Sequence, residues 1–143
     1  SRVSDATPER ILRTGLEPAA AVRNLGVVSA SDPLIQASLL GEAIDAADVL
    51  VFVADETATY IAVNRAACDE LGYTREELLG LHVTDIADYP EAVSEFEEMV
   101  HEGARRGTSV IRRKDGTTAE FRYRASTTTV AGMTLFVAVG VTD

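Results

Sequence analysis

The chain has 143 residues, a hydrophobic content of 46% and a formal net charge of −10. This length suffices for one domain with a core of its own and is short for two. The negative charge argues against direct nucleic-acid binding, which needs concentrated Lys and Arg, and a single cysteine excludes an internal disulfide. No apolar run reaches the ~18–20 residues that span a bilayer and no secretory signal is visible. We therefore expect a cytoplasmic protein without membrane contact.

Residues 1–33 are expected to form an N-terminal helical extension, because Thr7-Pro8-Glu9 is typical of a helix start. A second start signal, Ser31-Asp32-Pro33, precedes a leading amphipathic helix over 34–47. Its apolar stripe runs through Ala37, Leu40, Ile44 and Ala47. The stripe can cover the sheet of its own domain, or it can also pack on the same helix of a second copy.

Two short strands are predicted next, over Val49–Ala54 and Tyr60–Val63, because both runs are rich in β-branched, aromatic and small apolar residues. Asn64 is a good N-cap for a short helix over Arg65–Leu71. Gly72 can end that helix by taking positive φ.

The following segment predicts more short helices. Thr74 and Glu77 have capping-box spacing, and Thr84 or Asp85 can cap one further turn. A longer helix is predicted over Pro90–Arg105, where apolar residues recur at helical steps on one face. These residues are Val93, Phe96, Met99 and Val100.

Three strands are predicted to close the chain. Thr108–Arg113 turns at Lys114-Asp115-Gly116, a strong hairpin signal, into the alternating run Thr117–Val130. Met133–Val141 is nearly all apolar, which favours a central strand covered on both faces. The pattern predicts an α+β fold: one five-stranded antiparallel sheet with helices on one face.

The motifs VFVAD, VNRAACDELGYTREELLG and RRKDGT, in this order, resemble the PAS sensor family over roughly Leu40 to Asp143. The resemblance implies a PAS-like sensor domain over 34–143 that forms a homodimer through residues 34–47. Two departures stand out. The turn after Asp55 lacks the family's usual glycine, which predicts a looser turn. Gly140-Val141-Thr142 lacks the aspartate of the family's final Asp-Ile/Val-Thr, so the leading helices or a trimmed output domain are expected to carry the coupling.

The apolar side chains that face the helices are the candidate ligand-binding residues, by strand alternation and by the resemblance. They are Leu50, Phe52, Ala54, Phe96, Met99, Val100, Phe121, Tyr123, Phe136 and Ala138. The alternative is that they fill each other's space. A pocket for a small organic ligand needs roughly 300 Å³ or more and a few polar groups, which Tyr123, Thr127 and Arg112 could supply. The ligand itself is not predicted.

Other reactive residues point to no further chemistry. Cys68 is expected to be a small core thiol, and neither His82 nor His101 has a second ligand at helical spacing or the family's haem-binding position. Catalytic patterns are missing, so we expect no enzyme activity. The basic cluster Arg112-Arg113-Lys114 is either a solvated strand end or a contact for an acidic partner.

We therefore expect a signal-sensing or protein-interaction module of a cytoplasmic signalling or transcription-regulatory protein, with an output domain or partner protein downstream. It would bind a small organic ligand or relay a signal through the dimer. The alternative is a homodimerisation scaffold that binds no ligand.

Overall fold

The computed structural model describes residues 31–88 and 91–143 of the chain. It separates into two units, Ser1–Ile44 and Asp45–Asp143. The extension predicted over residues 1–33 lies almost wholly outside the described residues. The leading helix is present as α3, Pro33–Ala46, and begins where the Asp32 carboxylate accepts a hydrogen bond from the Leu34 N–H at 2.9 Å.

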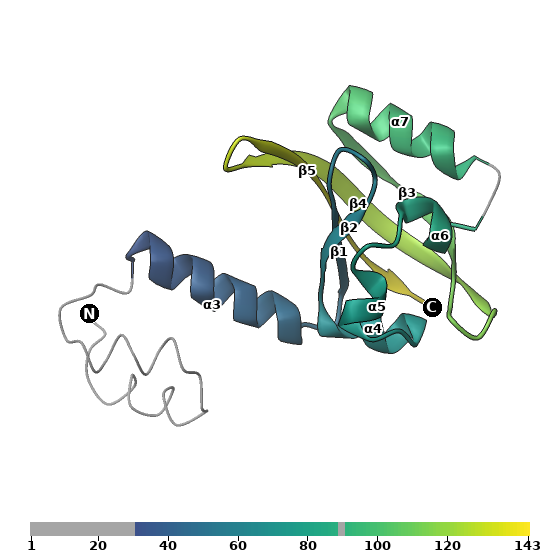
Figure 1. The fold of residues 1–143 in the computed structure, drawn as a ribbon, viewed down its shortest axis with the longest axis horizontal. Coiled ribbons are helices and arrows are strands. Elements are labelled where there is room, and N and C mark those ends of the chain that lie inside the picture. Colours follow the sequence, from purple (N-terminus) through teal and green to yellow (C-terminus); the bar gives the residue numbers. More distant parts are fainter. Residues whose placement is uncertain (1–30, 89–90) are drawn as a thin grey trace. The chain divides into compact units, whose positions relative to one another are not determined.

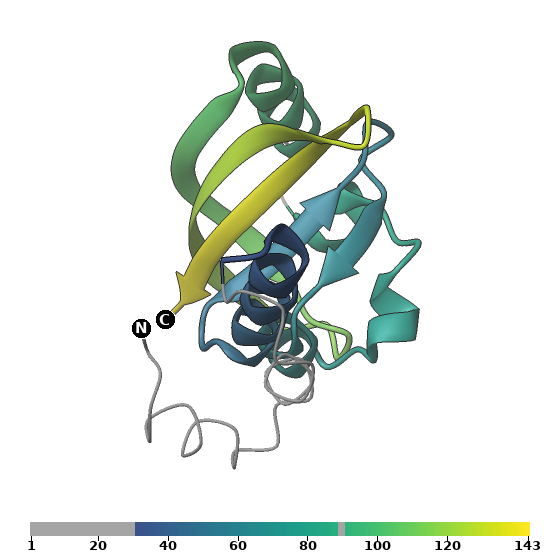
Figure 2. The same cartoon turned by 90° about the vertical axis from the view of Figure 1, so that its left-hand side faces the viewer.

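The second unit is built on a five-stranded antiparallel sheet with the strand order β2-β1-β5-β4-β3 (Figures 1 and 2). The strands are β1 Leu50–Ala54, β2 Tyr60–Val63, β3 Ala104–Arg112, β4 Thr118–Val130 and β5 Met133–Thr142. The helices between β2 and β3 are α4 Arg65–Leu71, α5 Arg75–Leu78, α6 Val83–Ile86 and α7 Ala92–Glu102. The predicted fold is confirmed.

The start of the helical segment follows local capping chemistry. Asn64 caps α4 by accepting a hydrogen bond from the Ala67 N–H, and Gly72 ends it at φ 80°. Thr74 and Glu77 form the predicted capping box of α5. The prediction for α6 needs a correction: its N-cap is His82, whose backbone N–H donates to Asp85 at 2.8 Å.

The core lies between the sheet and these helices. Leu71, Leu78 and Ile86, one from each of α4, α5 and α6, are the largest fully buried side chains and belong to the cluster that contains Phe52 and Phe121. A second cluster holds Met99 from α7 with Ala125 and Phe136 from the sheet. Tyr123 and Ala138 pack against both clusters. The helices thus cover one face of the sheet in two adjoining patches.

The boundary between α7 and β3 differs from the prediction over Pro90–Arg105. The predicted first residue, Pro90, lies outside the described residues. The helix ends at Glu102, because Gly103 takes φ 85° and its N–H donates to the Met99 carbonyl. Strand β3 then begins at Ala104 rather than Thr108, so Arg105 is a strand residue.

The first hairpin is more tightly held than predicted. The Asp55 carboxylate accepts hydrogen bonds from the Thr57 N–H at 2.9 Å and the Thr59 N–H at 3.2 Å. Ala58 takes φ 62° at the turn, in the left-handed region that glycine adopts more easily. A carboxylate therefore holds a turn in which the usual glycine is missing.

Strand β5 is central as predicted, but its outer face is only partly covered: Leu135 is buried at 8% exposure, and other residues of this face are not. Phe136 is buried, whereas Met133, Val139 and Val141 are 52%, 37% and 37% exposed. The apolar composition of the strand predicted burial on both faces.

Candidate functional site

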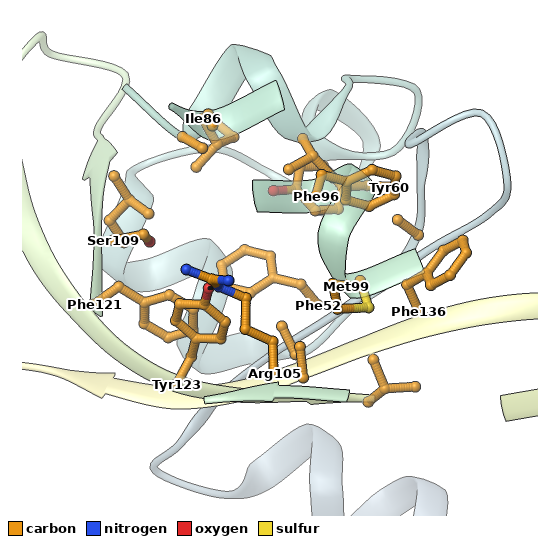
Figure 3. A pocket seen from close by; sticks show the side chains of 18 residues that line it. Phe52, Tyr60, Ile86, Phe96, Met99, Arg105, Ser109, Phe121, Tyr123 and Phe136 are labelled. Carbon is orange, nitrogen blue, oxygen red and sulfur yellow. Dashed lines mark hydrogen bonds between the residues drawn. The ribbon is translucent and has the colours of Figure 1, made fainter. Parts of the chain in front are cut away.

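A cavity of about 100 Å³ lies where the two core clusters meet, between the sheet and helices α6 and α7 (Figure 3). All five strands contribute to its walls. Phe52, Ala138, Ala125 and Arg105 form one continuous row of directly paired residues across β1, β5, β4 and β3. Because paired residues share a face of the sheet, this register brings all four to the cavity side.

Aromatic rings form most of the wall. The Phe52 ring lies 5.4 Å from Tyr60 and 5.6 Å from Phe121, and Phe121 stacks on Tyr123 at 5.6 Å between ring centroids. A separate pair, Phe96 of α7 and Phe136 of β5, meets edge-on at 5.2 Å. Such rings bury large areas and prefer these offset and edge arrangements, so they form stable walls around the cavity.

A few polar groups reach into this apolar space. Arg105 is the one charged side chain at neutral pH among the described lining residues. Its Nε donates to the Tyr123 hydroxyl at 3.1 Å, and its Nη1 donates to Glu98 Oε1 of α7 at 3.0 Å. Figure 3 shows the guanidinium among the rings, beside Tyr123. Ser109, only 8% exposed, adds a hydroxyl from the same strand. Apolar walls with a few polar groups are typical of small-molecule sites.

Eight of the ten candidate ligand-binding residues line the cavity. They are Phe52, Ala54, Phe96, Met99, Phe121, Tyr123, Phe136 and Ala138. Their role in binding a ligand stays a prediction. Val100 does not line the cavity: it is 44% exposed and faces a surface hollow that includes Val93 and Glu97. It follows Met99 on α7, and one helical step turns a side chain by about 100°.

Three further predicted residues also lie outside the cavity walls. Leu50 is buried in the core cluster instead. The Thr127 hydroxyl donates to the Gly103 carbonyl at 3.4 Å, and Arg112 pairs with Asp88 at 3.4 Å. The polar groups expected from Thr127 and Arg112 are supplied by Arg105 and Ser109.

Sequence reasoning missed Arg105 and Ser109 for identifiable reasons. Arg105 was assigned to the end of a helix, because that helix was expected to run two residues past Gly103, where the αL conformation of this glycine in fact ends it. Ser109 alternates correctly with Ile111 on β3, so strand periodicity could have placed it on the inner face. Ile86 and Tyr60 were missed because no prediction was made of which side chains in their segments face the cavity.

Tyr60 lines the cavity in its neutral form. It is 6% exposed, and burial, with a smaller contribution from the negative charge of Asp85, raises its pKa well above the ordinary range. No carboxylate is among the described residues that line the cavity. The site therefore offers hydroxyl donors and one cation to a bound molecule.

The basic cluster at the end of β3 is paired within the domain. Arg113 contacts Glu70 of α4 at 2.6 Å, and Lys114 contacts Glu77 of α5 at 2.7 Å. With Arg112 on Asp88, all three cations link the strand end to the helical segment. These pairs argue against the alternative in which the cluster serves an acidic partner.

Cys68 is half-buried beside the core, and burial raises the pKa of its thiol. That shift disfavours the reactive thiolate. Within residues 31–88 and 91–143, no three His, Cys, Asp or Glu side chains gather as metal ligands would. In the same part of the chain, no helix is long and apolar enough to cross a membrane.

Residues 48–143 match the sequence profile of the PAS domain. Since this match covers most of the chain and the fold agrees with it, the chain belongs to the PAS domain family. It has no match among curated proteins.

Solved PAS domains share the fold. One from an HTR-like protein of Haloarcula marismortui has 22% sequence identity and a TM-score of 0.68, with 76% of this chain and 92% of that chain covered. One from a two-component sensor histidine kinase has 17% identity and a TM-score of 0.70, over 78% and 100% of the two chains. A domain of a sensory box sensor histidine kinase/response regulator from Geobacter sulfurreducens has 20% identity and a TM-score of 0.66, over 78% and 98%.

Proposed function

We propose that this PAS domain is the sensory module of a cytoplasmic signalling or transcription-regulatory protein, and that it binds a small organic molecule in the cavity below α6 and α7. The observation that carries this proposal is the cavity itself, with its aromatic walls and, among the described lining residues, one cation and three hydroxyl-bearing side chains, Tyr60, Tyr123 and Ser109. The sensor histidine kinases among the solved relatives support a signalling role.

The cavity volume limits the ligand. At about 100 Å³ it is well below the ~300 Å³ typical of drug-sized ligands. A molecule of a few non-hydrogen atoms fits the space as it stands, and a larger one would have to displace α7. We therefore propose a small ligand, and we propose no catalysis, because no acidic side chain is among the described residues that line the cavity.

The signal would pass as a population shift in a homodimer formed through residues 34–47. Leu34, Leu40 and Ile44 of α3 are 80%, 61% and 42% exposed in the single chain, and such an apolar surface gains stability when a second copy covers it. A ligand shifts the dimer equilibrium only by its differential affinity for the two arrangements.

Native mass spectrometry of the purified full chain tests the ligand-binding role. Ala138→Leu places a larger side chain in the cavity and should abolish any stoichiometric bound mass that the wild type carries. Val139→Leu is the matched control, since Val139 lies on the opposite face of the same strand and is 37% exposed. A bound mass retained by Ala138→Leu would place the ligand elsewhere.

Light scattering tests the dimer. The double variant Leu40→Asp, Ile44→Asp should be a folded monomer, because four carboxylates would meet across a symmetric interface. Ser38→Asp adds a charge on the other side of α3 and should leave a dimer. An unchanged oligomeric state in the double variant would rule out this interface.

The second candidate is a homodimerisation scaffold without a ligand, and the small cavity volume favours it. The two proposals separate in one respect: a scaffold would show no bound mass in repeated preparations and no response of the dimer to small molecules.

A further inference from the structure

The placement of Arg105 sets the cavity apart from a simple apolar gap. Its side chain is 26% exposed, and the other described residues of the wall carry no charge at neutral pH. A guanidinium in a partly dehydrated site favours a carboxylate, which it can bind with charge-assisted, bidentate hydrogen bonds. The Tyr123 hydroxyl on its Nε holds the guanidinium in place from the sheet side.

We propose that the cavity selects a short-chain monocarboxylate, whose carboxylate binds Arg105 and whose apolar tail packs among the aromatic rings. This inference rests on the proposed ligand-binding function and names the class of ligand. The apolar walls exclude a second charged group on the ligand, because they offer it no partner.

Size sets the length of the acid. A cavity of about 100 Å³ corresponds to about three water molecules at ~30 Å³ each, and an apolar cavity of about 150 Å³ can hold benzene. The ligand carboxylate would take the place of the Glu98 carboxylate at Arg105, so only the tail has to fill this space. The three tail carbons of a four-carbon acid match it, whereas a long-chain fatty acid does not fit.

The carboxylate of Glu98 now occupies the position on Nη1 that the ligand would take. Glu98 is 59% exposed, and ion pairs at such exposure contribute little net free energy. A ligand carboxylate deeper in the cavity is less screened and replaces it at small cost. Binding would then replace the Arg105–Glu98 pair between β3 and α7, which gives the ligand a direct effect on the helix above the cavity.

The experiment is an NMR titration of the ¹⁵N-labelled full chain with butyrate, and with butyramide as a neutral probe of the same size, at neutral pH. We expect butyrate to shift backbone amides of the residues around Arg105, Tyr123 and Ala138. Its Kd should be at least about tenfold lower than that of butyramide.

Variants assign the selectivity to one side chain. Arg105→Gln should raise the Kd for butyrate about tenfold and leave butyramide unchanged, while Arg105→Lys should retain part of the preference for the anion. Arg106→Gln is the matched control, because Arg106 is the exposed next residue on the other face of β3. Glu98→Gln removes the competing carboxylate and should lower the Kd for butyrate severalfold.

The outcomes separate this inference from the proposed function. Equal binding of both probes at the cavity overturns the preference for an anion and leaves ligand binding intact. Chemical-shift changes confined to residues outside the cavity, or no changes with butyrate, overturn the inference. The proposed ligand-binding function is then still tested by whether another ligand copurifies with the protein. Weaker butyrate binding in Glu98→Gln overturns the exchange step.

Discussion

Asn64 links three elements through one side chain. Its Oδ1 accepts hydrogen bonds from the Val51 N–H at 3.0 Å and the Ala67 N–H at 3.1 Å, and its Nδ2 donates to the Val49 carbonyl at 2.8 Å. Its sequence context predicts the helix cap, because capping is local. The contacts with Val51 of β1 and with Val49 just before it are thirteen and fifteen residues away and follow only from the pairing of β1 with β2.

Asn64→Ala should therefore cost more than the loss of a cap. A cap alone contributes about 1 kcal/mol, and the Val51 N–H would lose its buried acceptor at about 1–3 kcal/mol more. We expect the free energy of unfolding, from urea titration, to fall by about 2–4 kcal/mol. Thr74→Ala removes an exposed cap and should cost about 1 kcal/mol; equal losses in the two variants would contradict the bridging role.

Gly140 occupies the position where the family commonly has an aspartate, and the packing explains the absence of a side chain. A Cβ at this position would lie 2.0 Å from the Arg122 carbonyl oxygen and 2.8 Å from the Tyr123 Cα. Backbone atoms cannot move away as a flexible side chain can, so any larger residue must displace β5 or β4.

Gly140→Ala should lower the free energy of unfolding by about 2–3 kcal/mol, as overpacking does. Gly107→Ala is the control within the same sheet, because its Cβ would meet the Tyr123 hydroxyl at an ordinary 3.6 Å. That variant should change stability by less than about 1 kcal/mol. Thermal or urea unfolding decides, and a neutral Gly140→Ala would show that the strands relax freely.

Burial of Tyr60 makes stability depend on alkaline pH. The raised pKa of the folded state means that the unfolded chain loses this proton first, near pH 10. The contribution of neutral Tyr60 to the free energy of unfolding is thus fully present below pH 10. It falls as the pH rises above 10, because the folded state then binds more protons than the unfolded state. Between pH 9 and 11 the free energy of unfolding of Tyr60→Phe should therefore fall by about 1.4 kcal/mol less than that of the wild type, measured by urea titration. Parallel curves would contradict a buried neutral phenol.

At the scale of elements, the helices α5 and α6 have four residues each, too few to be stable alone. Each is held by one fully buried side chain, Leu78 in α5 and Ile86 in α6. Tertiary packing and capping together, rather than helix propensity, keep this segment over the sheet.

The neighbours Leu78 and Leu79 test this dependence. Leu78 is 0% exposed and Leu79 is 37% exposed. Leu78→Ala should lower the free energy of unfolding by about 2–5 kcal/mol, whereas Leu79→Ala should cost less than about 1 kcal/mol. Similar losses would mean that the loop as a whole, rather than one buried residue, holds the segment.

Elements whose signals are local were predictable from the sequence. The capping residues Asn64 and Thr74 and the turn glycine Gly116 are such signals, and strands β1, β2, β4 and β5 begin and end close to the predicted residues. The predicted start of β3 was wrong, because the sequence Ala104-Arg105-Arg106 is also compatible with a helix. In the structure, Gly103 ends the helix just before these residues. Since Arg105 belongs to that stretch, the same error hid the one cation of the candidate site.

For the whole molecule, the sheet register could not be derived from one sequence. Strand alternation identifies an inner face, and this was enough to gather eight predicted residues around one cavity. The row from Phe52 through Ala138 and Ala125 to Arg105 depends on pairings between distant strands. The cavity volume depends on how the clusters under α6 and α7 meet, which composition does not specify.

The central claim is that occupancy of this cavity changes how two copies of the chain associate. The measurement is the dimer dissociation constant of the full chain by analytical ultracentrifugation. It compares wild type saturated with its bound molecule, or with butyrate, against ligand-free wild type and against Ala138→Leu. If the domain is a sensory module, the dimer dissociation constant of the saturated protein should differ severalfold from that of the ligand-free wild type and from that of Ala138→Leu. Identical dissociation constants, despite proven occupancy, would contradict the sensory role and leave a scaffold.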